Sequence, residues 1–150
     1  DWRLDLDVLE PPADATQEEA EEFLPEPPLV IGDEARLRQV VVNLLANARV
    51  HTPAGSHVTT TLAREGDTLI VRIHDDGPGI APDVRDRLFE RFARGDSSRE
   101  RRTGSTGLGM SIALAIVQSH GGSIDVVSST APEDHGTTFS VRLPAAVVEE

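Results

Sequence analysis

Two asparagines four residues apart are the first side chains whose type and spacing suggest a ligand site. Asn43 and Asn47 lie in a stretch whose apolar residues recur with helical spacing, so both amides are expected beside the apolar stripe of one helix. An amide oxygen is a neutral, hard ligand, which suits a Mg²⁺ ion that takes its other ligands from water and nucleotide phosphates. The alternative is the ordinary polar flank of a surface helix.

A second candidate site is the segment from Asp75 to Gly79, which follows an alternating, strand-like run. Its two glycines allow a ligand to approach the backbone closely. The carboxylate of Asp75 can accept a hydrogen bond from an exocyclic amine such as that of adenine. Guanine presents an acceptor there, and two facing buried acceptors cost on the order of a few kcal/mol. The alternative is a plain turn, because Asp-Gly and Pro-Gly are turn dipeptides.

A third candidate is the glycine-rich segment from Gly104 to Gly109, which opens a predicted helix. Free backbone N–H groups at a helix N-terminus bind phosphate readily. The segment matches neither the Walker loop nor the Rossmann fingerprint. Just before it, Arg99, Arg101 and Arg102 form a basic cluster on an acidic chain, and arginines on a mobile loop can close over a triphosphate. The alternative for this cluster is a solvated loop.

The elements that must position these residues follow from periodicity, caps and turns. Asp33 is the expected N-cap of a long helix whose apolar residues keep helical spacing from Leu37 to Ala48. The remaining predicted elements are a strand at 2–8, a hairpin of 58–62 with 69–73, a short helix from Pro82 to about Phe89, a helix at 108–120 ended by Gly121 and Gly122, and a hairpin of 124–127 with 138–143. This order predicts an α+β fold with helices on one face of a mostly antiparallel sheet.

Composition narrows the classes of partner. The 150 residues are enough for one domain, and 26 acidic against 14 basic side chains give a net charge of −12. This balance argues against nucleic acid and against direct contact with an anionic membrane. The chain has no cysteine, no apolar run near about 18 residues and no signal peptide. Residues 10–28 are acidic and proline-rich, which predicts a solvated loop.

Taken together, these segments resemble the ATP-binding catalytic domain of sensor histidine kinases. That domain belongs to the GHKL superfamily of Bergerat-fold proteins, with the gyrase, mismatch-repair and heat-shock-chaperone ATPases. The resemblance runs from about Gly32 to Pro144. The motifs that carry it are an asparagine box at 38–48, a first glycine box at 75–80, a phenylalanine box at 88–94, a second glycine box at 107–110, His120-Gly121-Gly122, and Gly136-Thr137-Thr138-Phe139.

The resemblance implies a role for most of these residues. Asn47 is expected to hold Mg²⁺ with Asn43 at the phosphates, and Asp75 to bind the adenine amine. Gly79 is expected to leave room for the ring, and Thr137 to support it through water. The full set of expected cofactor-binding residues is Asn43, Asn47, His51, Asp75, Gly77, Gly79, Ile80, Arg94, Thr106, Gly107, Leu108, Gly109 and Thr137. The implied fold is a two-layer α/β sandwich, a mixed and mostly antiparallel sheet with about three helices on one face.

Residues 1–150 are interpreted as one such domain, in which residues 10–28 form a variable acidic loop and residues 93–107 form the ATP lid. Two positions depart from the family pattern. Val50 replaces the usual Lys or Arg of the asparagine box, so His51 or a lid arginine is the expected substitute for the missing cation. Ser105 stands at a position of the second glycine box where the family frequently has glycine, so the lid is expected to be slightly stiffer.

The residue at position 43 indicates which reaction is expected. Hydrolytic members of the superfamily carry a glutamate there, whereas the Asn43 amide cannot take a proton from water. By resemblance, the nucleophile is a histidine on a separate helical dimerisation and phosphoacceptor domain, and Mg²⁺ and positioning assist an in-line transfer. None of the histidines at 51, 57, 74, 120 and 135 has the sequence context of the acceptor. The chain alone is therefore expected to bind Mg-ATP without phosphorylating itself.

The wider setting also follows from the resemblance. The parent is expected to be a membrane-anchored homodimer with this domain in the cytoplasm, and to pass its phosphoryl group to a response regulator receiver domain. The fragment itself is expected to be a monomer. Two alternatives stay open: a protein-serine kinase of the anti-sigma type from the same superfamily, and a nucleotide-sensing module without enzymatic activity.

Overall fold

The computed structural model describes residues 2–6, 14, 16–18, 28–90 and 109–147. Within these residues the elements follow one another as β1 (Trp2–Leu6), α2 (Glu34–His51), β2 (Val58–Glu65), β3 (Thr68–Asp75), α3 (Pro82–Arg85), α5 (Gly109–Ser119), β4 (Ser123–Ala131) and β5 (Asp134–Pro144). The predicted lid at 93–107 and most of the acidic loop at 10–28 lie outside the described residues.

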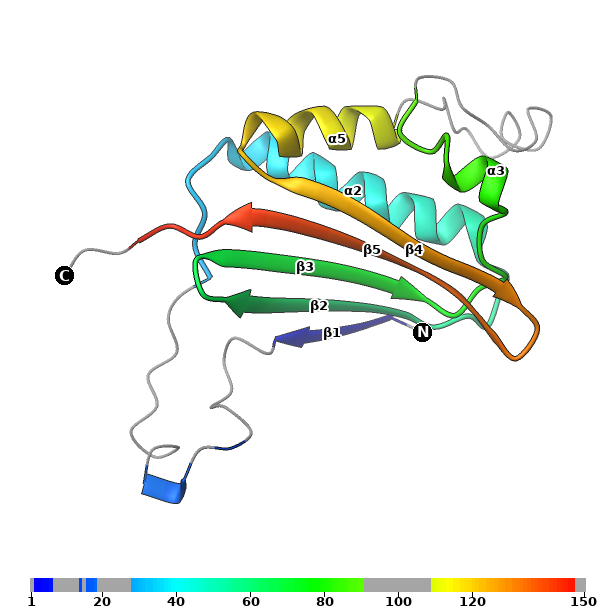
Figure 1. Cartoon of the computed structure of the whole chain (residues 1–150), viewed down its shortest axis with the longest axis horizontal. Coiled ribbons are helices and arrows are strands. Elements are labelled where there is room, and N and C mark those ends of the chain that lie inside the picture. Colours follow the sequence, from blue (N-terminus) through cyan, green and yellow to red (C-terminus); the bar gives the residue numbers. More distant parts are fainter. Residues whose placement is uncertain (1, 7–13, 15, 19–27, 91–108, 148–150) are drawn as a thin grey trace.

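The five strands form one sheet in the order β1-β2-β3-β5-β4. The edge strand β1 is parallel to β2, and every other neighbouring pair is antiparallel. Helices α2 and α5 lie side by side over one face of this sheet, and α3 lies on the same side (Figure 1). The predicted α+β fold, a mixed and mostly antiparallel sheet covered on one face by helices, is confirmed.

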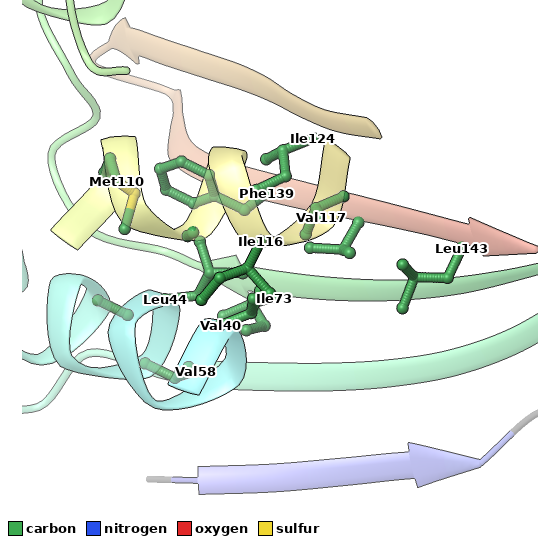
Figure 2. Packing of buried hydrophobic residues seen from close by; sticks show 13 residues of the cluster. Val40, Leu44, Val58, Ile73, Met110, Ile116, Val117, Ile124, Phe139 and Leu143 are labelled. Carbon is green, nitrogen blue, oxygen red and sulfur yellow. The ribbon is translucent and has the colours of Figure 1, made fainter. Parts of the chain in front are cut away.

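The core lies between the helices and the sheet (Figure 2). The predicted apolar stripe of α2 is confirmed, since Val40, Leu44 and Ala48 are at most 3% exposed. Opposite them, the sheet contributes Ile73 and Phe139, which are 1% and 2% exposed. Burial of each large side chain of this kind stabilises the fold by about 1.5–3 kcal/mol, which fixes α2 over the sheet.

Capping residues define where the helices begin and end. The side chain of Asp33 accepts a hydrogen bond from the Arg36 N–H at 3.1 Å, as predicted for the N-cap of α2. After α5, Gly121 has a φ of +75°, and the Gly122 N–H donates to the Val117 carbonyl at 2.9 Å. This hydrogen-bond pattern is a Schellman motif, so the predicted glycine ending is confirmed.

The short helix after Pro82 ends earlier than predicted. Helix α3 stops at Arg85 instead of continuing to Phe89. The next residues form tighter turns, in which the N–H groups of Arg87 and Leu88 donate to carbonyls three residues back, at 3.1 and 3.3 Å. The strands, by contrast, run longer than the predicted hairpins on both sides of their turns.

Candidate functional site

The end of β3 places a carboxylate under the helices. Asp75 is the last residue of β3 and lies directly opposite Thr137 of β5 in the sheet register. Side chains alternate along a strand, so Asp75 points to the same face as the core residue Ile73, toward the helix layer. Asp75 is 7% exposed and Thr137 is 3% exposed. Two buried polar side chains from neighbouring strands are therefore brought together on the helix side of the sheet.

The Asp75 carboxylate has little internal pairing. The Gly77 N–H donates to Asp75 Oδ1 at 3.0 Å, and in the described part of the chain no other group donates to this side chain. Burial raises the pKa of Asp75 above its ordinary value, and this rise is opposed by the Gly77 hydrogen bond and by the charges of His74 and His51. A buried acceptor without its full set of donors is suited to receive a donor from a ligand.

The neighbouring carboxylate is in a different environment. Asp76 accepts from the backbone N–H of His57 at 2.7 Å and contacts Nδ1 of the same ring at 2.9 Å. These hydrogen bonds lower the pKa of Asp76, and its side chain is 45% exposed. Of the two adjacent aspartates, Asp76 ties β3 to the start of β2, and Asp75 faces the interior of the site.

The glycines of this loop serve packing within the protein. A Cβ on Gly77 would lie 2.9 Å from both Asp75 Oδ1 and Thr52 Cγ2. Gly79 has a φ of +81°, and a Cβ there would collide with the Ser129 carbonyl of β4. On its Cβ side Gly79 therefore packs against the backbone of β4, and the expectation that Gly79 leaves room for an adenine ring stays a prediction. Glycine is required here for its backbone conformation and for the close approach of β4.

The β4–β5 hairpin holds this loop through two side chains that the sequence analysis did not select. His135 Nδ1 lies 2.6 Å from the Gly77 carbonyl, to which it donates. The Ile80 N–H donates to Ser128 Oγ at 2.8 Å. The partners are separated by 58 and 48 residues, so no local pattern signals either contact. Both side chains contact residues that the sequence analysis did select, Ile80 and Gly77, and Ser128 also lies opposite Thr137 in the register.

The asparagine helix meets the start of α5. Asn43 Nδ2 donates to the Gly109 carbonyl at 3.1 Å, which joins α2 to the end of the second glycine box. Because a carbonyl only accepts, this bond fixes the amide nitrogen toward Gly109 and leaves Oδ1 as the free acceptor or ligand atom. Asn47 lies one turn further along α2 and is half-buried. His51 is exposed on the last turn of α2.

Some predicted site residues are not placed. Arg94, Thr106, Gly107 and Leu108 lie outside the described residues. The remaining predicted residues fall into one group around the end of β3 and another between α2 and the start of α5. In the described ranges, no cluster of three or more His, Cys, Asp or Glu side chains is arranged to hold a metal ion.

This fold and these motifs define a recognisable class of ATP-binding domain. The chain belongs to the family of histidine kinase-, DNA gyrase B- and HSP90-like ATPases, whose model matches residues 32–147. The probable sensor histidine kinase TcrY of Mycobacterium tuberculosis is 52% identical over 120 residues, which are 80% of this chain and 24% of TcrY. The signal transduction histidine-protein kinase AfsQ2 of Streptomyces coelicolor is 42% identical over 112 residues, 75% of this chain and 20% of AfsQ2.

Solved structures agree with this assignment. The mycobacterial sensor histidine kinase MprB superposes with a TM-score of 0.72 at 28% identity, covering 98% of this chain and 83% of that one. Full-length ShkA in complex with AMPPNP superposes with a TM-score of 0.68 at 29% identity, covering 99% of this chain and 27% of ShkA. The chain is thus an ATP-binding catalytic domain of the sensor histidine kinase type. It spans about a quarter of the length of curated relatives such as TcrY. Among the described helices, none has the length and apolarity needed to cross a membrane.

Proposed function

We propose that this domain binds Mg-ATP and donates the γ-phosphoryl group to a histidine on a separate helical domain of its parent kinase. The observation that carries the proposal is the buried Asp75 carboxylate, which keeps acceptor capacity free directly opposite Thr137. The relative ShkA was solved with AMPPNP, an adenine nucleotide, which supports the same ligand class here.

Asp75 is proposed to select the base. Its carboxylate accepts a hydrogen bond from the exocyclic amine of adenine, and the Gly77 N–H keeps the carboxylate oriented. A guanine base would place its carbonyl oxygen against the same carboxylate and leave two acceptors facing each other. Residues Gly77, Gly79 and Ile80 then act by holding the loop beneath the base, since Gly79 packs on β4.

The phosphates are proposed to lie between α2 and the start of α5. Asn43 Oδ1 and the Asn47 amide are the oxygen donors available to a hydrated Mg²⁺, and Gly109 opens the helix at the phosphate end. When bound, Mg²⁺ would neutralise part of the negative charge of the phosphates. Gly107, Leu108, Arg94 and Thr106 are proposed to complete this part of the site.

The acceptor is proposed to come from outside the chain. His57, His74, His120 and His135 each have a hydrogen-bonding partner within the fold, namely Asp76, Thr138, Asp33 and Gly77. Asn43 cannot act as a base toward water, so ATP is held for another nucleophile. In this proposal the parent is a membrane-anchored homodimer, the domain works in the cytoplasm, and a response regulator receives the phosphoryl group.

Thermal melting with and without nucleotide tests base recognition. With Mg²⁺ and ATP at about 100 times Kd, the melting temperature is expected to rise by roughly 5–10 °C, and GTP is expected to leave it unchanged. Asp75→Asn should abolish the rise, because the Gly77 N–H keeps the amide oxygen as its acceptor and leaves the amide nitrogen, a donor, facing the adenine amine. Asp76→Asn is the matched control and should keep the rise. A rise that survives in Asp75→Asn would remove Asp75 from the site.

Phosphoryl transfer is tested by adding the helical phosphoacceptor domain of the parent kinase in trans with labelled ATP. The expected result is acid-labile label on that domain's histidine and none on this chain. Label on serine would indicate the anti-sigma type of kinase. Binding of ATP with no transfer to the parent's own acceptor domain would indicate a nucleotide-sensing module. Label on this chain alone would contradict the proposed absence of an acceptor.

A further inference from the structure

A small pocket lies beside the glycine loop that follows β3, at the end of the sheet where α2 ends (Figure 1). Its volume is about 240 Å³. Three segments meet around it: the turn after α2, the loop after β3 and the β4–β5 hairpin. The lining residues are Pro53, Asp76, Gly77, Pro78, Thr130 and His135. Among the described members of the predicted cofactor-binding set, only Gly77 lines this pocket, so the pocket is distinct from the candidate nucleotide site.

Gly77 stands between this pocket and Asp75. Its N–H donates to Asp75 Oδ1 at 3.0 Å, and its carbonyl accepts from His135 Nδ1 at 2.6 Å. Thr130 and His135 are directly opposite in the register of β4 and β5, so both side chains lie on one face of the sheet. The loop therefore faces Asp75 with the Gly77 N–H and faces the pocket with the Gly77 carbonyl.

The polar groups of the pocket are a negative charge and a ring acceptor. In the neutral form of His135 that donates from Nδ1, Nε2 carries no proton and accepts. Hydrogen bonds from His57 lower the pKa of Asp76, so this carboxylate stays anionic near neutral pH. A carboxylate has about four lone-pair positions, and the two bonds from His57, at 2.7 and 2.9 Å, leave acceptor capacity on Asp76. These groups favour a cation that carries more than one N–H.

The size and walls of the pocket narrow the choice of cation. Pockets for drug-sized ligands have about 300–1,000 Å³, so this smaller pocket suits a group the size of one side chain. Pro53 and Pro78 add apolar rings to the lining. An ammonium group is compact and strongly hydrated, whereas a guanidinium group is planar, more weakly hydrated and presents several N–H donors in fixed directions. A guanidinium group therefore matches the pocket better than an ammonium group.

We propose that this pocket binds a guanidinium group, with the Asp76 carboxylate as its charged acceptor and His135 Nε2 as a second acceptor. The group belongs either to a free small molecule or to an arginine side chain of a partner protein. This site does not depend on the proposed binding of ATP, and it lies against the opposite side of the loop that orients Asp75.

Titration of the nucleotide-free chain with ethylguanidine, followed by amide NMR, tests the site. Saturable shifts are expected at the amides of Gly77, Thr130 and His135, with a Kd of about 1 mM. Tetramethylammonium has the charge but no N–H, so it should bind at least about tenfold more weakly. Asp76→Asn should also weaken ethylguanidine binding at least about tenfold.

Asp134→Asn is the matched control for the loss of one charge. Asp134 is an exposed carboxylate on the same hairpin and does not line the pocket, so its loss should change the Kd by less than about twofold. Equal weakening in both variants would reveal general attraction of cations to an acidic chain, and would overturn the inference. If Asp76→Asn does not fold, Thr130→Lys carries the test, because it adds an ammonium group to the exposed rim and should block binding.

A capped tripeptide with a central arginine distinguishes the two sources of the group. Tighter binding of the tripeptide than of ethylguanidine would indicate a partner's arginine, and equal or weaker binding would indicate a free guanidinium compound. Displacement of ethylguanidine by Mg-ATP would make the pocket part of the nucleotide site and would refute a separate site. A chain that binds ethylguanidine but no ATP would contradict the proposed function alone.

Discussion

The two ends of α2 lie over opposite ends of the sheet (Figure 1), and polar groups from several elements meet at each end. At the His120 end, where α2 begins, the Asp33 N–H donates to His120 Nε2 at 3.0 Å, and His120 Nδ1 donates to the Ile116 carbonyl at 2.7 Å. The ring also packs on Gly32, where a Cβ would collide with it. Both ring nitrogens are used, so this end is internally paired and links α5 to α2.

At the Asp75 end, the loop after β3 is also held by a histidine, His135, on the Gly77 carbonyl. Here, however, the buried Asp75 carboxylate receives a single N–H, and its pKa is raised by burial. Polar groups whose hydrogen bonds are satisfied within the chain stabilise the fold, whereas a buried group with unused acceptor capacity is available to a ligand. Changes at the His120 end should alter stability, and changes at the Asp75 end should alter nucleotide binding.

The largest expected effect is Gly122→Ala at the His120 end. A Cβ there would collide with the Arg142 carbonyl and lie 3.0 Å from Val117 Cγ1, so the variant should lose about 3 kcal/mol of unfolding free energy. Urea denaturation measures the loss, and the Kd for ATP at low temperature should be unchanged. Gly66→Ala is the control, because its φ is +60° and nothing lies within 4 Å, so only about 1 kcal/mol is lost. Weaker ATP binding in the folded Gly122→Ala protein would show that the two ends are coupled.

The two histidines give a paired test of the comparison. His120→Ala removes the partner of the Asp33 N–H and one of several donors to the Ile116 carbonyl, which keeps Ser119 Oγ and the residue-120 N–H. The unfolding free energy should fall by about 1 kcal/mol with little change in ATP affinity. His135→Ala removes the donor to the Gly77 carbonyl and should lower stability by less than about 0.5 kcal/mol, because the ring is exposed, while ATP binding weakens about fivefold. Denaturation and calorimetry on both variants measure the pattern, and the reverse pattern would contradict it.

Asp75 should carry a stability penalty that depends on pH. Because burial raises its pKa above 3.8, the folded protein holds this proton more tightly than the unfolded chain. Stability therefore falls as pH rises from about 3.8 through the raised folded value, and the penalty is constant above it. Asp75→Asn should raise the melting temperature of the nucleotide-free protein by about 3 °C at pH 7 and by nothing at pH 3. An equal difference at both pH values would count against ionisation as the cause.

The smallest change in stability is expected for the exposed pair of His57 and Asp76, which lies beside Asp75. Hydrogen bonds from His57 lower the pKa of Asp76, so Asp76 contributes stability that is present above pH 3.8 and is lost as pH falls through its lowered folded value. His57→Ala removes the ring but keeps the backbone donor. The melting temperature should change by less than about 1 °C at pH 7, because such surface pairs contribute little. A larger drop in a thermal melt would mean that the ring holds the start of β2.

Local chemistry makes much of the fold predictable from the sequence. The spacing of Val40, Leu44 and Ala48 predicts both the helix and its buried face, since side-chain direction follows from the helical period. Asp33 as N-cap and Gly121 as the residue after α5 follow in the same way, because each is a property of a few neighbouring residues. Asp75 is also predictable as a candidate ligand-binding residue, because a carboxylate directly after a strand-like run can be recognised in the sequence.

Features that depend on distant partners are not predictable in this way. The alternation of apolar and polar residues at 2–8 predicts a strand, but it does not show that β1 pairs parallel to β2. The space beside Gly79 is decided by the backbone of β4. The contacts of Ser128 and His135 join the hairpin to the glycine loop through tertiary structure alone. A serine or a histidine in a hairpin carries no local signal of such a partner.

The pairing of Asp75 with Thr137 depends on one alignment of β3 against β5. A slip of one residue would turn Thr137 to the outer face and bring Thr138 under the helices, together with every other alternate side chain of β5. In the proposed site, that slip would separate Asp75 from Thr137 on the helix side of the sheet. Adenine nucleotide is therefore expected to stabilise only refolded chains in which β3 and β5 have this alignment.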